Sequence, residues 1–166
     1  MKLQDYINKH GNVEIEEKQL NELLGIKESK VWKPQLCDKF WSINALGDIA
    51  ATYWQSTNDS HEALWLMGNV FKTKEEAEFA VEKRKVKVEL QRYADEHNEC
   101  EIDWEDSSQE KKYIKFHHDY NEFSIRNSFV EQHSNTVYFT SKEIAEQAIQ
   151  AIGEERLKKY YFGVEE

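Results

Sequence analysis

The sequence has little proline, glycine and cysteine, and it has no long hydrophobic run. Its 166 residues include one Pro, six Gly and two Cys. Cys37 and Cys100 are far apart and form no paired-cysteine motif, so we expect two reduced thiols and no disulfide. No segment approaches the roughly 18 apolar residues of a membrane span. The start, Met1–Asp5, also lacks the basic and then apolar pattern of a secretory signal, so we expect a cytoplasmic protein without a membrane partner.

The sequence also lacks the common catalytic motifs. It contains no glycine-rich phosphate loop, no Gly-x-Ser-x-Gly elbow and no His-Glu-x-x-His. His97-x-x-Cys100 has the spacing of a zinc-ligand pair, but no second pair completes four ligands. Asp103 with Glu110-Lys111-Lys112 has the residue types of a metal-dependent nuclease, yet such groups are common in a chain that is 33% charged. We therefore expect no enzymatic activity, no cofactor and no metal.

Positive charge is scarce relative to negative charge. The chain carries 32 acidic and 22 basic residues, for a net charge of −10. An acidic excess of this size disfavours wrapping of DNA, because phosphate binding requires clustered cations and gains its affinity from counterion release. Direct binding to nucleic acid is therefore not our first expectation, although a local basic patch stays possible.

Aromatic residues, in contrast, are abundant. Five Trp, eight Tyr and eight Phe are spread along the sequence, which is typical of a folded chain with its own core rather than of a disordered one. Most of these rings must fill the core. An alternative role for some of them is to line a cleft between the two sequence repeats described below, which would hold a nucleotide or a signalling small molecule by stacking.

The chain contains an internal duplication with an offset of 68 residues. Six of eleven positions are identical between Val70–Ala80 and Tyr138–Ala148. Each copy is preceded by aromatic and β-branched segments flanking turn-forming residues, which predicts a β-hairpin. The predicted hairpin strands are Phe40–Asn44 with Ile49–Trp54, and Tyr113–His117 with Phe123–Phe129.

A third strand and a helix are predicted to follow each hairpin. We place the third strands at Leu64–Phe71 and Thr136–Phe139. Each helix starts at a Ser/Thr-x-x-Glu capping box, at Thr73–Glu76 in the first copy and at Thr140–Glu143 in the second. The first helix is apolar on two faces, one with Ala77 and the other with Val86 and Leu90, and so needs two packing partners.

These patterns predict an α+β protein made of two tandem β-β-β-α repeats. The expected organisation is an N-terminal helical arm (residues 1–30), a first repeat (31–98) and a second repeat (99–166). A unit of about 68 residues is marginal alone, so we expect the two antiparallel sheets to pack about a pseudo-twofold axis. Whether the protein is a monomer or a homodimer stays open.

An acidic run separates the two predicted repeats. Eight carboxylates and no Lys or Arg lie between Asp95 and Glu110. One interpretation is a solvated linker. The other is a negatively charged surface that occupies the nucleic-acid-binding groove of a partner protein, with an aromatic anchor. The candidate binding residues of this surface are Glu99, Glu101, Asp103, Trp104, Glu105 and Asp106.

A basic cluster on the first predicted helix offers an alternative binding site. It consists of Lys83, Arg84, Lys85 and Lys87. At helical spacing these side chains point around the whole helix rather than along one stripe. Ion pairing with neighbouring acids such as Glu82 and Glu89 is therefore the simpler interpretation, and contact with nucleic acid is the alternative.

Four segments resemble a widespread family of uncharacterised proteins from phages, prophages and mobile elements of Gram-positive bacteria. They are Val31-Trp-Lys-Pro34, the predicted hairpin with Gly47-Asp48, Gly68-Asn-Val-Phe-Lys-Thr-Lys-Glu-Glu-Ala-Glu78 and Gly153-Glu-Glu-Arg-Leu-Lys-Lys-Tyr160. The resemblance brings no catalytic residues. It implies a small accessory protein that acts by binding, as inhibitors of host defence such as anti-CRISPR proteins do. We therefore expect a non-enzymatic protein that binds and inhibits a host protein, such as a nucleic-acid-binding defence protein or CRISPR effector.

Overall fold

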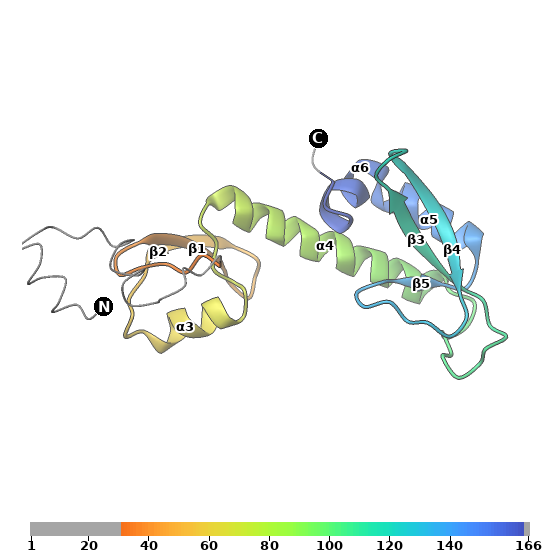
Figure 1. Ribbon diagram of the computed structural model, residues 1–166, viewed down its shortest axis with the longest axis horizontal. Coiled ribbons are helices and arrows are strands. Elements are labelled where there is room, and N and C mark those ends of the chain that lie inside the picture. Colours follow the sequence, from red (N-terminus) through yellow and green to blue (C-terminus); the bar gives the residue numbers. More distant parts are fainter. Residues whose placement is uncertain (1–30, 165–166) are drawn as a thin grey trace, which may run out of the picture.

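Residues 31–164 are described by a computed structural model, which has an α+β architecture with two antiparallel sheets (Figure 1). The expected N-terminal helical arm lies outside the described residues. The elements in chain order are β1 (Lys39–Ile43), β2 (Ile49–Tyr53), α3 (Asp59–Leu66), α4 (Lys74–His97), β3 (Lys111–His117), β4 (Glu122–Ser128), β5 (Tyr138–Phe139), α5 (Lys142–Ile152), α6 (Glu154–Arg156) and the π-helical turn η1 (Leu157–Tyr161).

Both predicted hairpins are confirmed. β1 pairs with β2 from Lys39 opposite Tyr53 to Ile43 opposite Ile49. The Asn44 side chain organises the turn between them, because its Oδ1 accepts hydrogen bonds from the amides of Leu46 (2.8 Å) and Asp48 (2.9 Å). Asx turns of this kind are why Asn favours such positions.

The third strand expected at Leu64–Phe71 is wrong. Most of that region belongs to α3 and the turn after it, and only Phe71 pairs with β1, through two backbone hydrogen bonds with Trp41 (2.8 and 2.9 Å). The helix forms because Asn58 Oδ1 caps the amide of Ser60 and because Asp59 and Glu62 place negative charge in the first turn. Residues 31–98 therefore have the order β-β-α-α, not β-β-β-α.

The second predicted strand set is confirmed in residues 99–164. β3 lies in the centre of a three-stranded sheet of order β4-β3-β5. β5 is short and pairs only with Lys112 and Tyr113 of β3. α5 then begins, but its N-cap is Ser141, whose hydroxyl accepts from the amide of Ile144, and not Thr140 as expected. The helix ends at Gly153, whose φ of 96° favours glycine.

α4 connects the two halves of the described chain: it contacts β1 and β2 of the first sheet, and it packs against α5 and η1 in the second half (Figure 1). It begins at the predicted capping box, with Thr73 bonded to the amide of Glu76 and Glu76 bonded back to Thr73. Near its start Ala77 is buried, and further along Val86 and Leu90 enter the main core. The expectation that this helix needs two partners agrees with this arrangement.

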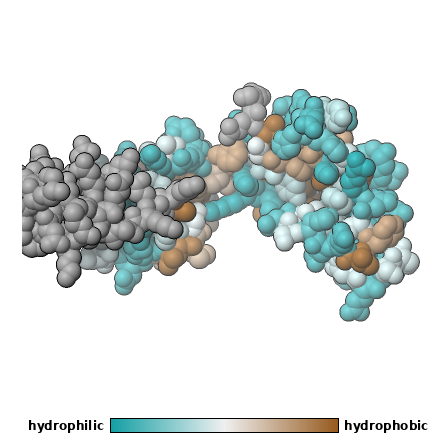
Figure 2. All heavy atoms as spheres, viewed as in Figure 1, coloured by the Kyte–Doolittle hydropathy of each residue, from teal (hydrophilic) through white to brown (hydrophobic). Residues whose placement is uncertain are grey.

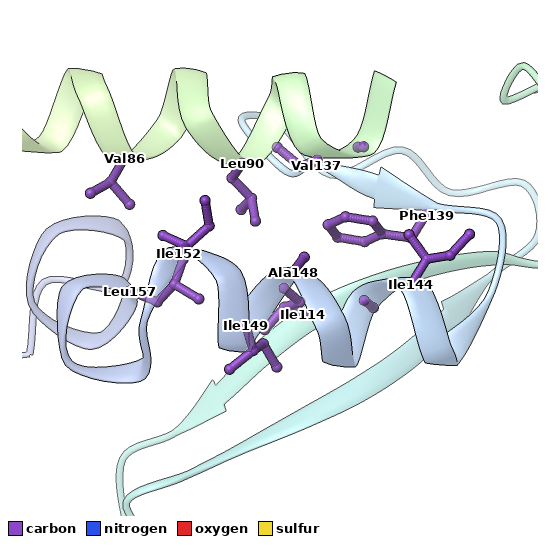
Figure 3. Close-up of a cluster of buried hydrophobic side chains, with 12 residues drawn as sticks. Val86, Leu90, Ile114, Val137, Phe139, Ile144, Ala148, Ile149, Ile152 and Leu157 are labelled. Carbon is purple, nitrogen blue, oxygen red and sulfur yellow. The ribbon is translucent and has the colours of Figure 1, made fainter. Parts of the chain in front are cut away.

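The main core lies between α4, α5 and the inner face of the β3–β5 sheet (Figure 3). It consists of Val86, Leu90, Ala94, Ile114, Val137, Phe139, Ile144, Ala145, Ala148, Ile149, Ile152 and Leu157. A separate, smaller group of buried rings lies under the first hairpin, where Phe40 contacts Trp54 (5.6 Å between ring centroids) and His61 (5.1 Å). Most of the described surface seen in Figure 2 is hydrophilic.

Candidate functional site

The acidic run forms a folded loop at the end of α4. We call residues 99–110 the acidic loop. The start of the loop is fixed by Asn98, the residue that ends α4. The side-chain NH₂ of Asn98 donates to the carbonyl of Tyr138 (3.1 Å), and its side-chain oxygen accepts from the backbone amide of Thr140 (2.9 Å). The Thr140 hydroxyl in turn accepts from the amide of Glu99 (3.1 Å). The first residues of the loop are therefore attached to the β5 end of the sheet.

The end of the loop is held by Lys111, the first residue of β3. Its side chain is fully buried, and Nζ donates to the carbonyls of Asp106 (2.8 Å), Gln109 (3.0 Å) and Phe129 (3.0 Å). An ammonium group has three donors, so all of its hydrogen bonds are satisfied, as burial of a charge requires. Lys111 is therefore a structural clamp between the acidic loop and the end of β4, and its ammonium is not available to assist an attacking water.

Trp104 packs against the same clamp. Its ring meets the buried ring of Tyr138 edge-on, with 4.8 Å between centroids, and Lys111 Nζ lies 5.4 Å from the Trp104 ring centroid. An ammonium at this distance from an indole is attracted by the ring quadrupole. The half-buried Trp104 thus fixes the loop on its own sheet, and only part of the ring is left for contact with a partner.

Hydrogen bonds within the loop set its backbone. The Gln109 side chain spans it, accepting from the amide of Asp103 (2.8 Å) and donating to the carbonyl of Glu101 (2.8 Å). Asp106 accepts from the amide and the hydroxyl of Ser108 (2.8 and 2.6 Å). These two bonds, the hydroxyl first, lower the pKa of Asp106 and keep it ionised.

The candidate carboxylates of this loop are exposed. Glu99, Glu101 and Glu105 have no ion pair within residues 31–164, and neither do Asp103 and Asp106. Glu110 differs, because it pairs with Lys112. The loop therefore presents five exposed carboxylates that have no ion pair among the described residues.

A hollow of about 580 Å³ separates the loop from the end of α4. It is lined by Gln91, Asp95, Asn98, Cys100, Glu101, Ile102, Trp104, Gln132, Thr136 and Tyr138. We call it the acidic hollow, because its lining includes two carboxylates and no cation. A cationic side chain placed here would meet the carboxylates of Asp95 and Glu101 and the ring of Trp104.

The predicted basic cluster is divided between two sides of α4. Lys83 and Lys87 face a groove shared with β3, whereas Arg84 and Lys85 line a separate small hollow with Arg92. The predicted ion pair of Lys85 with Glu82 is present (2.7 Å).

Glu89 does not pair with the cluster as expected. It forms a two-point ion pair with Arg156, with N–O distances of 2.7 and 3.2 Å. Hydrogen bonding to Arg156 lowers the pKa of Glu89 despite partial desolvation, and the same bond raises the pKa of Arg156.

The sequence predicted the acidic residues of the loop, but it did not predict that Lys111 and Asn98 hold the loop in place. The available signal for Asn98 was an amide residue directly after a long helical pattern, a common helix-ending position. Lys111 gives no such signal.

Comparison with known proteins identifies no relatives: no protein-family model, no curated protein and no solved structure matches this chain. Within residues 31–164, no group of three or more His, Cys, Asp or Glu side chains is arranged to hold a metal ion. None of the helices described there is long and apolar enough to cross a bilayer.

Proposed function

We propose that the protein acts by binding rather than by catalysis, and that its acidic loop docks on a basic, nucleic-acid-binding surface of a partner protein and blocks it. The observation that carries this proposal is the clamp formed by Lys111. A buried ammonium bonded to three loop and strand carbonyls holds the backbone in one shape while the carboxylates stay outside. A solvated linker has no need of such a clamp.

Preorganisation supports binding through this loop. A flexible acidic segment loses conformational entropy when it docks, whereas a loop already held by its own hydrogen bonds loses less. The charges of Glu99, Glu101 and Glu105, which form no ion pair in the part of the chain that the structure describes, favour approach to a positive surface and accelerate the encounter at low salt. Cations that would otherwise contact phosphates are then occupied by carboxylates, which excludes nucleic acid from the same surface.

The acidic hollow supplies a specific contact for such a partner. Interfaces gain most of their affinity from a few anchored side chains, and Arg is prominent among them. An Arg or Lys inserted between Glu101 and Asp95, next to Trp104, would pair with both acids. We propose further that the partner is a protein of a bacterial host, as for inhibitors of host defence; this part of the proposal rests only on the sequence segments that resemble phage-type proteins.

We also propose that the two halves of the chain descend from one duplicated unit packed about a pseudo-twofold axis. The six identities at an offset of 68 residues support this. The pattern of pairing agrees with it, because the first hairpin strand of each half also pairs with an aromatic residue just before a helix. These pairs are Trp41 with Phe71 and Lys112 with Phe139.

The partner can be identified by affinity capture from host lysate on the full chain, with and without nuclease treatment, followed by mass spectrometry. The proposal predicts a stoichiometric protein that is retained after nuclease treatment. The purified partner should then lose a labelled oligonucleotide when the protein is added. A partner that binds without releasing nucleic acid would contradict the blocking role.

Charge reversal then tests the loop itself. Asp103 and Asp106 bond to backbone amides of the loop, so the cleaner double variant is Glu101→Lys with Glu105→Lys. We expect affinity for the partner to fall about tenfold or more. The matched control, Asp119→Lys with Glu122→Lys, changes charge equally at the opposite end of the β3–β4 hairpin. Equal losses in both variants would show that the acidic loop is not the docking surface.

A further inference from the structure

A second concave site lies on the side of α4 that carries Lys83 and Lys87. This groove has a volume of about 520 Å³, within the usual range of small-molecule sites. Its walls are α4, the middle of β3, the segment 133–136 and the end of η1. Except for Thr136, its lining residues differ from those of the acidic hollow. We call it the basic groove.

The basic groove is locally positive in a chain of net charge −10. Three lysines line it, Lys83, Lys87 and Lys115, together with His133 and no acidic residue. Within residues 31–164 none of the three lysines forms an ion pair, and Lys87 Nζ instead donates to Asn135 Oδ1 (2.7 Å). Cations gathered without counter-charge in an acidic protein favour an anionic ligand.

Aromatic side chains form the rest of the wall, and their own contacts hold them. The Tyr161 hydroxyl donates to the carbonyl of Asn135 (3.1 Å) and accepts from the amide of Val137 (3.3 Å). Burial raises the pKa of this phenol, so it stays protonated. Tyr160 packs on Phe79, and Tyr113 packs edge-on against His133 (5.1 Å). Fixed rings beside cations suit a ligand that has both a planar base and a phosphate.

The edge of β3 supplies polar groups for recognition of that base. β5 pairs with β3 only at Lys112 and Tyr113. From Ile114 onward, the side of β3 away from β4 has no strand partner among residues 31–164, and Ile114, Lys115 and Phe116 line the basic groove. In an antiparallel strand every second residue directs both its N–H and its C=O to that side. The N–H and the C=O of one such residue can together form hydrogen bonds with the donor and acceptor groups on the edge of a base.

From this combination we infer that the basic groove is a nucleotide-binding site. Lys83, Lys87 and Lys115 take the phosphates, and the base lies against the tyrosine rings beside the free edge of β3. The volume suits a single nucleotide rather than an oligomer. The inference is independent of the acidic loop and would stand if that proposal failed.

The test is isothermal titration calorimetry. The full chain, freed of bound ligand, is titrated with ADP, GDP, CDP and UDP in turn. The four corresponding nucleosides and inorganic pyrophosphate test the two halves of the ligand separately. We expect at least one nucleotide to bind at least about tenfold more tightly than its nucleoside and than pyrophosphate. Amide chemical-shift changes on titration should centre on Tyr113, Ile114 and Lys115.

Variants on opposite sides of one helix provide the matched control. Lys83→Gln with Lys87→Gln should weaken nucleotide binding about tenfold or more, whereas Arg84→Gln with Lys85→Gln should leave it within about twofold. All four side chains are exposed, and the two double variants remove the same charge, so we expect both variants to fold.

Several results would overturn the inference. They are absence of binding by all four nucleotides, equal affinity for pyrophosphate, and equal losses in the two variants. Preference for an octanucleotide or an acidic peptide over every mononucleotide would also contradict it, because the site would then be a surface for a polymer.

Discussion

At the scale of single residues, Lys111 explains why the acidic loop has a defined backbone conformation. The acids of residues 95–110 are evident in the sequence, so the sequence predicted which side chains carry the charge. It could not predict the clamp, because the acceptors of Lys111 are backbone carbonyls at Asp106, Gln109 and Phe129. Backbone groups bear no residue-type signal, and one of these three is 18 residues away. The shape of the candidate site thus depends on a lysine whose environment only the fold reveals.

Replacing Lys111 should release the loop. In Lys111→Met three carbonyls lose a buried donor, so we expect the free energy of unfolding to fall by about 2–4 kcal/mol. Urea denaturation measures this loss, and cleavage by a glutamate-specific protease should accelerate within residues 99–110. Lys112→Met is the control: its ion pair with the exposed Glu110 is worth under about 1 kcal/mol. A Lys111 variant as stable and as protease-resistant as Lys112→Met would contradict the clamp.

The ion pair of Glu89 with Arg156 predicts a pH dependence. The pKa of Glu89 is lower in the folded protein than its ordinary value of 4.5, so its contribution is present above that pH and is lost as the pH falls through the folded pKa. Because the Glu89 side chain is 38% exposed, the contribution at neutral pH is under about 1 kcal/mol. Glu89→Gln should therefore be slightly less stable than wild type at pH 7, and the difference should disappear in strong acid. A difference that is constant across the titration would contradict this assignment.

At the scale of elements, local signals decided which predictions were correct. The hairpins followed from strand patterns around Asn44–Asp48 and Asp119–Glu122, and α4 followed from its capping box. The strand expected at Leu64–Phe71 failed because the cap at Asn58 starts a helix across the first part of that apolar run. The helix keeps no residue buried, so burial of an apolar face does not explain it. The N-cap residue Asn58, and not the apolar pattern after it, is therefore the sequence signal that identifies α3.

The cap of α5 is a second element on which the sequence and the structure differ by one residue. With Ser141 as the N-cap, Ser141→Ala should lower the free energy of unfolding by about 1 kcal/mol. Thr140→Ser should be nearly neutral, because it keeps the hydroxyl that accepts from Glu99. Thermal or urea denaturation of the two variants measures both effects. If Ser141→Ala left the free energy of unfolding unchanged, Thr140 and not Ser141 would be the N-cap of α5.

At the scale of the whole molecule, α4 belongs to two packing units at once. The main core takes Val86, Leu90 and Ala94 from α4 but no residue from β1, β2 or α3. The smaller unit under the first hairpin uses Phe40, Trp54 and His61, with Ala77 of α4 buried nearby. This division could not be predicted from the sequence, because equal repeats imply equal cores. Most of the buried hydrophobic residues instead belong to the core of the three-stranded half.

This unequal sharing of α4 predicts unequal coupling between the two halves. Phe40→Ala removes the ring at the centre of the smaller unit and should cost about 3–5 kcal/mol there. Since no residue of that unit is in the main core, β1 and β2 should then open locally while β3 and α5 stay folded. Native-state hydrogen exchange followed by NMR would show faster exchange of amides in β1 and β2 only.

Leu90→Ala is the complementary change. It weakens the core that holds the second half of α4, and the same helix also contacts β1 and β2. Opening of the main core therefore removes the support of the smaller unit as well, and amides in both halves should exchange faster. If Phe40→Ala instead accelerated exchange in β3 as much as in β1, the chain would unfold as one unit. The acidic loop, which follows the end of α4, and the basic groove, which uses Lys83 and Lys87 of α4, would then depend on the first hairpin for their stability.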